Sequence, residues 1–230
     1  MTQDEIFLKN EGDHWFARNR AFLDSVESLI DDPVIRVLSL TKLVPQKVLE
    51  VGASNGYRLQ EIHRRFHCPV TAVEPSAEAI RNGQAGHPAV RFLRGTAAQL
   101  SGLEAAEFDL VIVHFVFHWI DRACLLRSAA ELDRVLQDGG YLMIGDFLPA
   151  RPQRVNYHHL PGQGVWTYKQ NYAEVFLGTN LYDLIACIPF LHGTGELRHD
   201  AASTERSQIF LLRKRLQAGY ETVENLGKVP

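Results

Sequence analysis

Cysteine is scarce in this sequence, and its spacing excludes the classes of protein that cysteine patterns define. Cys68, Cys124 and Cys187 are odd in number and far apart, so they suit neither a disulfide framework nor a zinc site. We expect them to be buried thiols of a reducing compartment.

Long apolar runs and a strong excess of one charge are also absent. No apolar run is long enough to span a bilayer, and residues 1–5 have neither the basic nor the apolar region of a signal peptide. The net charge of −3 gives no general attraction to nucleic acid or to an anionic membrane. We therefore expect a cytoplasmic protein with no nucleic-acid partner and no membrane partner.

The composition that remains is that of an ordinary globular protein. Of the 230 residues, 46% are hydrophobic and 22% are charged, which is enough apolar material for a sizeable core. No internal repeat or low-complexity linker interrupts the chain. The sequence therefore predicts a single domain, residues 1–230.

The rest of the chain is organised around residues 48–56. An apolar, mostly β-branched run surrounds Glu50. Two glycines, Gly52 and Gly56, come after this run, and a helical pattern begins at Tyr57. This order predicts a strand, a tight turn and a helix. Glycines let such a turn bend sharply and approach a ligand, while the helix N-terminus offers free N–H groups to an anionic moiety.

A second predicted strand, residues 70–74, ends on Glu74, about 20 residues beyond the glycines. A nucleotide-binding βαβ unit has its ribose-binding carboxylate at this spacing. The turn, however, has Ser54 and Tyr57 where a dinucleotide fold has its second and third glycines. No Gly-Lys-Ser/Thr step follows, which excludes a P-loop.

The segments Val-Leu-Glu-Val-Gly-Ala-Ser-Asn-Gly and Val-Thr-Ala-Val-Glu-Pro-Ser resemble two motifs of class I S-adenosylmethionine (SAM)-dependent methyltransferases. They correspond to motif I and its acidic partner, and the resemblance covers residues 47–147 well. It implies an α/β fold of the Rossmann-like, doubly wound type, with a seven-stranded, mostly parallel sheet and helices on both faces. An N-terminal helical lid and a cap insertion after the fifth strand complete the expected fold.

The resemblance also implies SAM as the cofactor, S-adenosylhomocysteine as the product and a set of binding residues. Glu50 would orient the turn or the cofactor's amino group, and Glu74 would bind the ribose hydroxyls. Thr96 stands where the family most often has an acidic residue that accepts from adenine, so a backbone N–H from Ala97 would serve instead. The full expected set is Trp15, Arg18, Glu50, Gly52, Ala53, Ser54, Asn55, Gly56, Glu74, Pro75, Gly95, Thr96, Ala97 and His114.

Residues 4–44 have the pattern of helices that precede the first strand. The cluster at residues 14–18 resembles one in the lid that covers the cofactor and acceptor in related methyltransferases. On that interpretation Trp15, with Arg18 or Arg20, lies near the methionine end of SAM, where a cation would meet its carboxylate. The alternative is a surface helix that docks its aromatic side chains on the core.

The fourth predicted strand, residues 107–114, is a continuous apolar run typical of a parallel strand buried on both faces. Residues 115–121 follow at the end where open α/β sheets bind ligands, and they resemble motif IV of small-molecule methyltransferases. His118 would be a general base there, because imidazole has an unperturbed pKa of about 6.5. The alternative is that it hydrogen-bonds the backbone and shapes the loop.

Prolines and glycines interrupt the pattern in residues 148–167, around a polar, aromatic segment at 156–159. In the class I fold an insertion here commonly covers the acceptor, so we expect Tyr157, His158 or His159 to face it. Paired histidines also suggest a metal, but adjacent side chains on a strand point apart and no carboxylate or cysteine supports them. We therefore expect no metal.

The remaining periodicity predicts helices over 123–135 and 166–176, a fifth strand over 141–147, and an antiparallel edge pair over 181–189 and 208–215. The expected buried stripe of the first helix is Leu125, Leu126, Ala129, Leu132 and Leu136. The domain then divides into a lid (1–44), a SAM-binding core (45–147), an acceptor-covering insertion and helix (148–180), edge strands (181–215) and a polar tail without an assigned role (216–230).

From the resemblance we expect a methyltransferase that methylates an O or N nucleophile of a small polar metabolite, such as a sugar or a natural-product intermediate. A homodimer is compatible with this interpretation. The candidate catalytic residues are His118, Tyr157, His158 and His159, although an acceptor that is already a good nucleophile needs no base. A non-catalytic SAM-binding subunit, which would lack an acceptor pocket behind His118, is the first alternative. An NAD-dependent dehydrogenase is the second, and the turn spacing argues against it.

Overall fold

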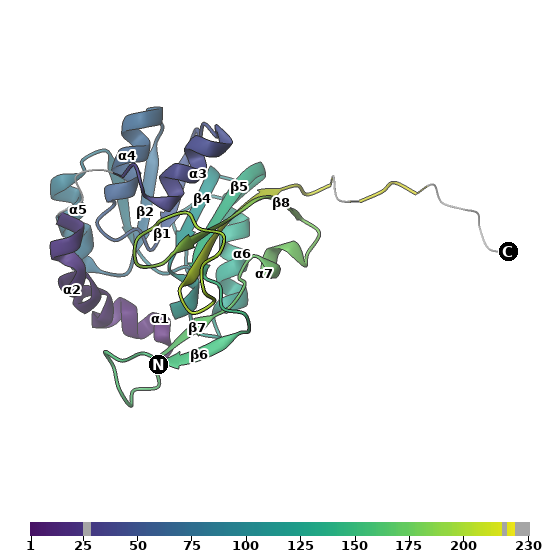
Figure 1. Cartoon of the computed structure of the whole chain (residues 1–230). Coiled ribbons are helices and arrows are strands. Elements are labelled where there is room, and N and C mark those ends of the chain that lie inside the picture. The colour runs from purple at the N-terminus through teal and green to yellow at the C-terminus, as the bar shows by residue number, and fades with distance from the viewer. Residues whose placement is uncertain (25–28, 218–219, 224–230) are drawn as a thin grey trace.

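The computed structural model describes residues 1–24, 29–217 and 220–223, and it has a central sheet with helices packed on both sides (Figure 1). The strand order is β3-β2-β1-β4-β5-β9-β8, which confirms the predicted seven-stranded sheet. Its parallel part consists of β1 (Val48–Val51), β2 (Val70–Glu74), β3 (Val90–Arg94), β4 (Phe108–His114) and β5 (Leu136–Phe147). The edge pair, β9 (Arg206–Lys214) and β8 (Tyr182–Leu191), is antiparallel as predicted.

The strand order reverses at the centre of the sheet. β1 pairs in parallel with β2 on one side and with β4 on the other, so that Val51 lies opposite both Val73 and Val113. The chain therefore leaves β1 towards one edge and β4 towards the other. A crevice opens at such a point outside the carboxyl ends of the strands, and this is where open α/β sheets bind ligands.

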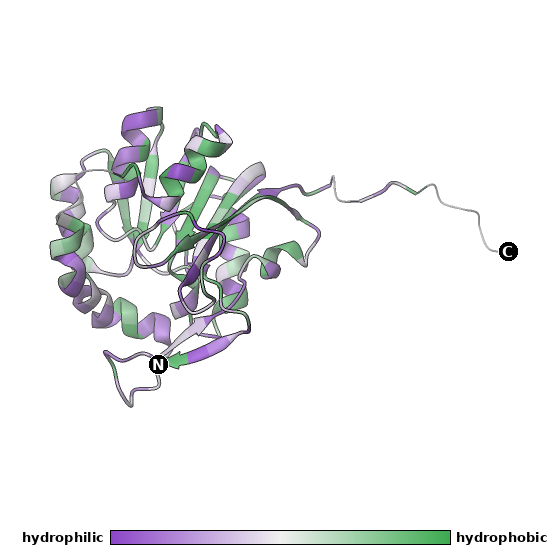
Figure 2. Cartoon of the chain, in the orientation of Figure 1, coloured by the Kyte–Doolittle hydropathy of each residue, from purple (hydrophilic) through white to green (hydrophobic). Residues whose placement is uncertain are grey.

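Helices bury both faces of the sheet. The side chains of α3 (Pro33–Thr41) and α4 (Tyr57–Phe66) join the hydrophobic core on one face, and those of α6 (Leu125–Val135) and α7 (Glu174–Leu177) join it on the other. Figure 2 shows the hydrophobic colour concentrated on the central strands, while the outer helix α4 is largely hydrophilic. No helix in the described ranges is long and apolar enough to cross a membrane.

Two helices begin where the sequence predicts. The carboxylate of Asp32 accepts hydrogen bonds from the N–H groups of Val34 and Ile35, and Pro33 occupies the first position of α3. Ser76 caps α5 (Ala77–Gly86) through its hydroxyl, which accepts from the N–H of Ala79 at 3.0 Å. These side chains supply acceptors that the first turn of each helix lacks.

Within the predicted lid, residues 3–24 form a continuous helical segment made of α1 (Gln3–Ile6), the π-helical η1 (Phe7–Glu11) and α2 (Gly12–Asp24). It runs along one side of the molecule from α5 to the small sheet formed by β6 and β7 (Figure 1). Asp13 fixes its middle, because its Oδ1 accepts from the Ser76 hydroxyl at 2.7 Å and from the N–H of Glu78 at 3.0 Å.

Three predictions from the sequence are wrong. Residues 166–169 form a strand, β7 (Trp166–Lys169), which pairs with β6 (Gln153–Asn156), and helix begins only at Glu174. The reason is that the glycine-rich turn lets β-forming aromatic residues pair with β6 instead of continuing a helix. In α6, Leu126 is 75% exposed and Ser128 is buried in its place. Among the cysteines Cys68 is buried, but Cys187 is exposed and Cys124 is half-buried.

Candidate functional site

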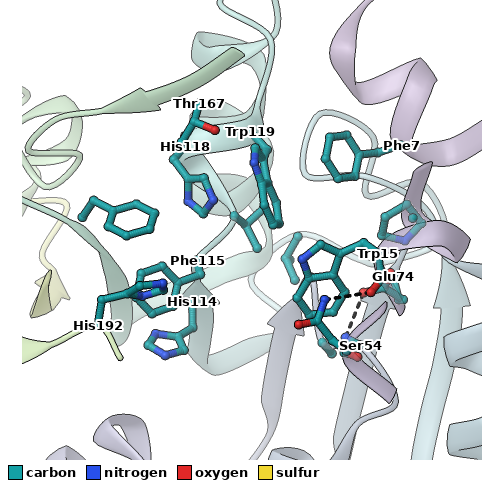
Figure 3. Close-up of a pocket in the computed structure, with 18 of the residues that line it drawn as sticks. Phe7, Trp15, Ser54, Glu74, His114, Phe115, His118, Trp119, Thr167 and His192 are labelled. Carbon is teal, nitrogen blue, oxygen red and sulfur yellow. Dashed lines mark hydrogen bonds between the residues drawn. The ribbon is translucent and has the colours of Figure 1, made fainter. Parts of the chain in front are cut away.

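A cavity of about 990 Å³ opens at the carboxyl ends of β1, β2 and β4. The lid, the end of β6 with the turn that follows it (residues 155–159) and the β8–β9 loop at residues 192–195 form its other walls. A volume at the upper end of the usual range of small-molecule sites leaves room for more than a single small ligand. Figure 3 shows side chains from the helical segment at residues 3–24, the carboxyl ends of the strands and the β8–β9 loop converging on it.

The turn after β1 has a shape that only glycine permits at Gly52. Its φ is +73°, and a Cβ added there would lie 2.3 Å from Cγ2 of Val116. The N–H of Gly52 donates to the carbonyl of Val73 at 2.7 Å, which ties the turn to β2. Gly52, Ala53 and Ser54 all line the cavity.

Glu74 lies at the end of β2 and faces this turn. Its Oε2 accepts from the N–H of Ser54 at 2.8 Å, and its Oε1 accepts from the N–H of Ser76 at 2.9 Å. Burial raises the pKa of Glu74 to about 7, although these two amides favour the ionised form. A carboxylate oxygen can accept more than one hydrogen bond, so Glu74 retains capacity for donors that enter the cavity. Figure 3 shows Glu74 beside Ser54.

The predicted adenine loop also lines the cavity. Gly95 follows β3, and its N–H donates to the backbone carbonyl of Glu74 at 3.1 Å. The carbonyl of Thr96 accepts from the N–H of Gln99 at 3.1 Å, which keeps the loop tight. Pro75, Gly95, Thr96 and Ala97 are all part of the cavity wall.

Glu50, Asn55 and Gly56 do not line the cavity that the described residues form; they lie behind the turn. Glu50 forms a buried ion pair with Arg58, which also binds Asp32 at 2.9 Å. Burial raises the pKa of Glu50, and the positive charge of Arg58 opposes this. Of the two alternatives that the sequence left open, this geometry favours a Glu50 that orients the turn.

Asn55 and Gly56, like Glu50, hold the turn after β1 in place and, in the part of the chain that is described, do not face the cavity. The Asn55 amide donates to Oδ1 of Asn82 at 3.0 Å, which joins the turn to α5. Gly56 precedes α4 with φ +76°, and a Cβ there would lie 2.7 Å from the ring of Phe92.

Trp15 and Arg18, both from the predicted lid, line the cavity. The guanidinium of Arg18 is already paired, since its Nη2 donates to Oε1 of buried Glu11 at 2.5 Å and to the hydroxyl of Tyr157 at 2.9 Å. The Tyr157 hydroxyl in turn donates to Glu11 at 2.8 Å. This triad links the lid to the segment that follows β6.

The three residues that directly follow β6, Tyr157, His158 and His159, differ in their surroundings. Burial, followed by the hydrogen bond to Glu11, raises the pKa of Tyr157, so its phenol stays protonated and links elements without serving as a base. His158 and His159 are exposed at the rim, with ring centroids 3.9 Å apart, and both line the cavity. No group of three or more metal-ligating side chains occurs in the described ranges.

His118 is buried in the short helix η2 (Phe117–Trp119), directly after β4, and lines the cavity. Its Nδ1 lies 2.9 Å from Oδ1 of Asp146, and its backbone N–H donates to Oδ2 of Asp146 at 3.2 Å. An Nδ1–H that donates to this carboxylate leaves Nε2 with a free lone pair. The sequence interpretation missed Asp146, although its position near the end of β5, beside the end of β4, was a usable signal.

His114, the last residue of β4, also lines the cavity. Its ring packs over Gly145 of β5, where a Cβ would lie 2.2 Å from Nδ1. That Nδ1 is buried without a hydrogen-bond partner among the described residues. Burial, followed by the positive charge of Arg58, lowers the pKa of His114 to about 3, so the imidazole is neutral.

The sequence interpretation also missed part of the cavity wall formed by Phe115, Phe147, Lys169 and His192. The ring of His192 lies 4.7 Å from that of Phe115 and 4.6 Å from that of Phe147, centroid to centroid. Nζ of Lys169 lies 4.0 Å from the centroid of Phe147. These residues come from four separate elements, so no local pattern marks them as a group.

Comparison with known proteins agrees with this geometry. Residues 49–144 match the family model described as a methyltransferase domain. A malonyl-[acyl-carrier protein] O-methyltransferase from Halorhodospira halophila is 25% identical over 158 residues, which are 67% of this chain and 50% of that protein. The chain therefore spans about half the length of the curated relative it matches.

Solved structures show the same fold. The 1,6-didemethyltoxoflavin-N1-methyltransferase of Burkholderia thailandensis superposes with a TM-score of 0.68 at 16% identity, covering 92% of this chain and 90% of that one. The N-methyltransferase NodS of Bradyrhizobium japonicum superposes with a TM-score of 0.60 at 16% identity, covering 82% and 90%. Together with the family match, this likeness shows that residues 49–144 form a methyltransferase domain with the fold of class I SAM-dependent enzymes.

Proposed function

We propose that the chain transfers the methyl group of SAM to an oxygen or nitrogen nucleophile of a small polar metabolite, such as a sugar or a natural-product intermediate. One observation supports this most strongly. The Gly52–Glu74 end and the buried imidazole of His118 open onto the same cavity, which is large enough to hold a ligand beside the cofactor. The relatives named above are O- and N-methyltransferases, in keeping with either nucleophile.

The residues present fit SAM. Glu74 retains acceptor capacity for the two ribose hydroxyls, and the hydroxyl of Ser54, buried without a partner in the described structure, adjoins the same space. The loop from Gly95 to Ala97 lies next to Glu74, where we place adenine. SAM supplies an electrophilic methyl group on a sulfonium, so the protein's main tasks are to orient the acceptor and to remove one proton.

We assign the proton transfer to His118. Its Nε2 is the free acceptor when Nδ1–H donates to Asp146, and the buried carboxylate stabilises the imidazolium that forms when Nε2 takes a proton. Tyr157 is unsuitable because its phenol has a raised pKa. His158 and His159 remain candidates for contacts with the acceptor at the rim.

The alternatives fit the cavity less well. A non-catalytic SAM-binding subunit needs no space behind His118, yet the wall there continues through Phe115, Phe147 and His192. A dehydrogenase needs glycines where Ser54 and Tyr57 stand. The net charge of the protein is −3, so it has no general electrostatic attraction for a nucleic-acid substrate.

The proposal is tested by release of S-adenosylhomocysteine from SAM in the presence of a panel of hydroxyl- and amine-bearing metabolites. The wild type is expected to be active on at least one of them, and His118→Asn is expected to lower kcat by about 100-fold or more, since general-base catalysis contributes that much. His67→Asn is the control: His67 is exposed with φ +55°, a conformation that asparagine tolerates. Equal kcat values in the two variants would refute the assignment of His118, and a wild type inactive on the whole panel would count against the proposed acceptors.

A further inference from the structure

The side of the cavity away from Glu74 is walled by aromatic rings. We call Phe115, His118, Phe147 and His192 the aromatic chamber. The ring of Phe147 lies 5.1 Å from that of Phe115 and 5.0 Å from that of His118, centroid to centroid. In Figure 3, His118, Phe115 and His192 lie on the opposite side of the view from Ser54 and Glu74. Ring edges and faces at such spacings favour a flat aromatic ligand over a saturated one.

One cation adjoins this chamber. Lys169, the last residue of β7, lines the cavity with Nζ above the ring of Phe147. The other lysine or arginine side chains in the described wall, Arg18 and Arg58, are bound to carboxylates. Within the described ranges, the ammonium of Lys169 forms no ion pair with a carboxylate, and it keeps three N–H donors for a ligand.

The histidine beside Lys169 does not compete for an anion. Burial, followed by the nearby His118 and Lys169, lowers the pKa of His192, which favours its neutral imidazole. The carboxylate of Asp146 is occupied by His118 and by the N–H of Phe147 at 2.8 Å. In this part of the cavity, Lys169 is therefore the group that would bind a negatively charged group of a ligand.

These observations extend the proposed function, on which they rest. We propose that the methyl acceptor is an aromatic acid: a planar ring held in the aromatic chamber, with an anionic group paired to Lys169 and a ring-borne O–H or N–H at His118. Nε2 of His118 takes the proton of that O–H or N–H. The electron pair left on the oxygen or nitrogen forms the new bond to the methyl carbon. The carbon–sulfur bond would break in the same displacement, with its electrons going to sulfur, which would become the neutral thioether of S-adenosylhomocysteine.

A neutral aromatic ligand would fit the chamber but would cover the ammonium of Lys169 without pairing it, which is costly for a desolvated charge. A saturated acid would pair with Lys169 but would lose the ring contacts with Phe115 and Phe147. Charge and aromaticity are therefore separable requirements, and each can be tested with its own analogue.

The test is calorimetric binding to protein saturated with S-adenosylhomocysteine. The probes are 2-, 3- and 4-hydroxybenzoate, the three matching hydroxybenzamides, and 4-hydroxycyclohexanecarboxylate. At least one hydroxybenzoate is expected to bind, with its amide and the cyclohexane acid about tenfold weaker or undetectable. Lys169→Met is expected to weaken the benzoate by about tenfold, and Lys169→Arg to restore most of its affinity.

Arg154→Met is the matched control. Arg154 lies on the partner strand β6, is exposed, and stacks its guanidinium on Trp166 at 4.1 Å, but it does not line the cavity. Arg154→Met, like Lys169→Met, removes a cation and a cation–π contact from the hairpin. Because Arg154 does not line the cavity, its replacement should leave benzoate binding unchanged. Thermal unfolding of both variants checks that the hairpin is intact.

Each contrary outcome overturns the proposal. It fails if the amides bind as well as the acids, if no benzoate binds, or if Lys169→Met binds benzoate like the wild type. It also fails if Lys169→Met loses affinity for S-adenosylhomocysteine, because Lys169 would then serve the cofactor carboxylate. Wild-type binding of S-adenosylhomocysteine is measured first, and its absence would refute the proposed function itself, separately from the acceptor class.

Discussion

At the scale of single residues, the carboxylate of Glu74 has two roles: it holds the turn after β1, and we propose that it binds the ribose. Its two oxygens hold the N–H groups of Ser54 and Ser76, which shapes the turn, and the capacity that remains is what we propose for the ribose. Burial raises its pKa to about 7, so the group titrates near neutral pH. Because the folded-state pKa lies above the ordinary value of 4.5, the unfolded state loses its proton first. Glu74 therefore lowers the stability of the unliganded protein progressively as the pH rises from about 4.5 to about 7, and no further above that.

Cofactor binding should depend on pH through this residue. Ribose hydroxyls donate to the ionised carboxylate, so the Kd for S-adenosylhomocysteine should be constant well above pH 7. The Kd should rise as the pH falls below the Glu74 pKa of about 7, by at most about tenfold per pH unit. Calorimetry between about pH 5.5 and pH 8.5 measures this. Glu74→Gln should bind weakly with a nearly flat profile, and a wild-type Kd that is equal at both ends of the range would contradict the assignment.

Gly145 sets the position of His114. A Cβ at residue 145 would lie 2.2 Å from Nδ1 of His114, on a central strand that cannot shift freely. Gly145→Ala should therefore lower the free energy of unfolding by about 1–3 kcal/mol and weaken cofactor binding. Urea unfolding measures the first effect.

Gly86→Ala is the control for this substitution, because a Cβ there meets nothing within 4 Å and the residue lies in helix α5. It should leave stability unchanged or raise it slightly. Equal stabilities of the two alanine variants would show that His114 is not held by the space above Gly145.

At the scale of elements, the lid is docked through polar contacts as well as aromatic ones. The side chain of buried Gln3 donates to the carbonyls of Trp119 at 2.9 Å and Trp166 at 3.0 Å, and it accepts from the N–H of Trp166 at 2.7 Å. One amide thus joins α1 to η2 and to β7. The alternative of a helix that merely rests its aromatic residues on the core does not include these contacts.

Removing this amide should loosen the lid. Gln3→Ala leaves backbone groups of Trp119 and Trp166 without partners, which should cost about 1–3 kcal/mol and speed hydrogen exchange in the described lid, residues 3–24. Hydrogen exchange read by mass spectrometry measures it. Gln84→Ala, on the exposed side of α5, is the control. Unchanged exchange in Gln3→Ala would mean that other contacts alone hold the lid.

The element scale also shows where sequence patterns were sufficient. Asp32-Pro33 and Ser76 predicted helix starts correctly because a cap is a local interaction between residues two or three positions apart. Residues 166–169 became a strand because their partner, β6, lies across a turn, and periodicity within one segment does not include the partner.

At the scale of the whole molecule, the two ends of the cavity differ in how far the sequence predicted them. The Gly52–Glu74 end arises from two consecutive strands with a fixed spacing, so a linear motif contains most of it. The aromatic chamber joins Phe115 from the segment after β4, Phe147 from β5 and His192 from the β8–β9 loop. Asp146 meets His118 only because β4 and β5 are neighbours. Strand order had to be known before these residues could be grouped.

The most direct test of the account is calorimetric titration of S-adenosylhomocysteine into the wild type, Glu74→Ala and Glu78→Ala. Glu78 is a half-exposed carboxylate in the first turn of α5, four residues from Glu74, and it does not line the cavity. We predict micromolar affinity for the wild type and Glu78→Ala, and affinity at least about tenfold weaker for Glu74→Ala, since two charge-assisted hydrogen bonds are lost. No binding by the wild type, or equal affinity in Glu74→Ala, would contradict the account.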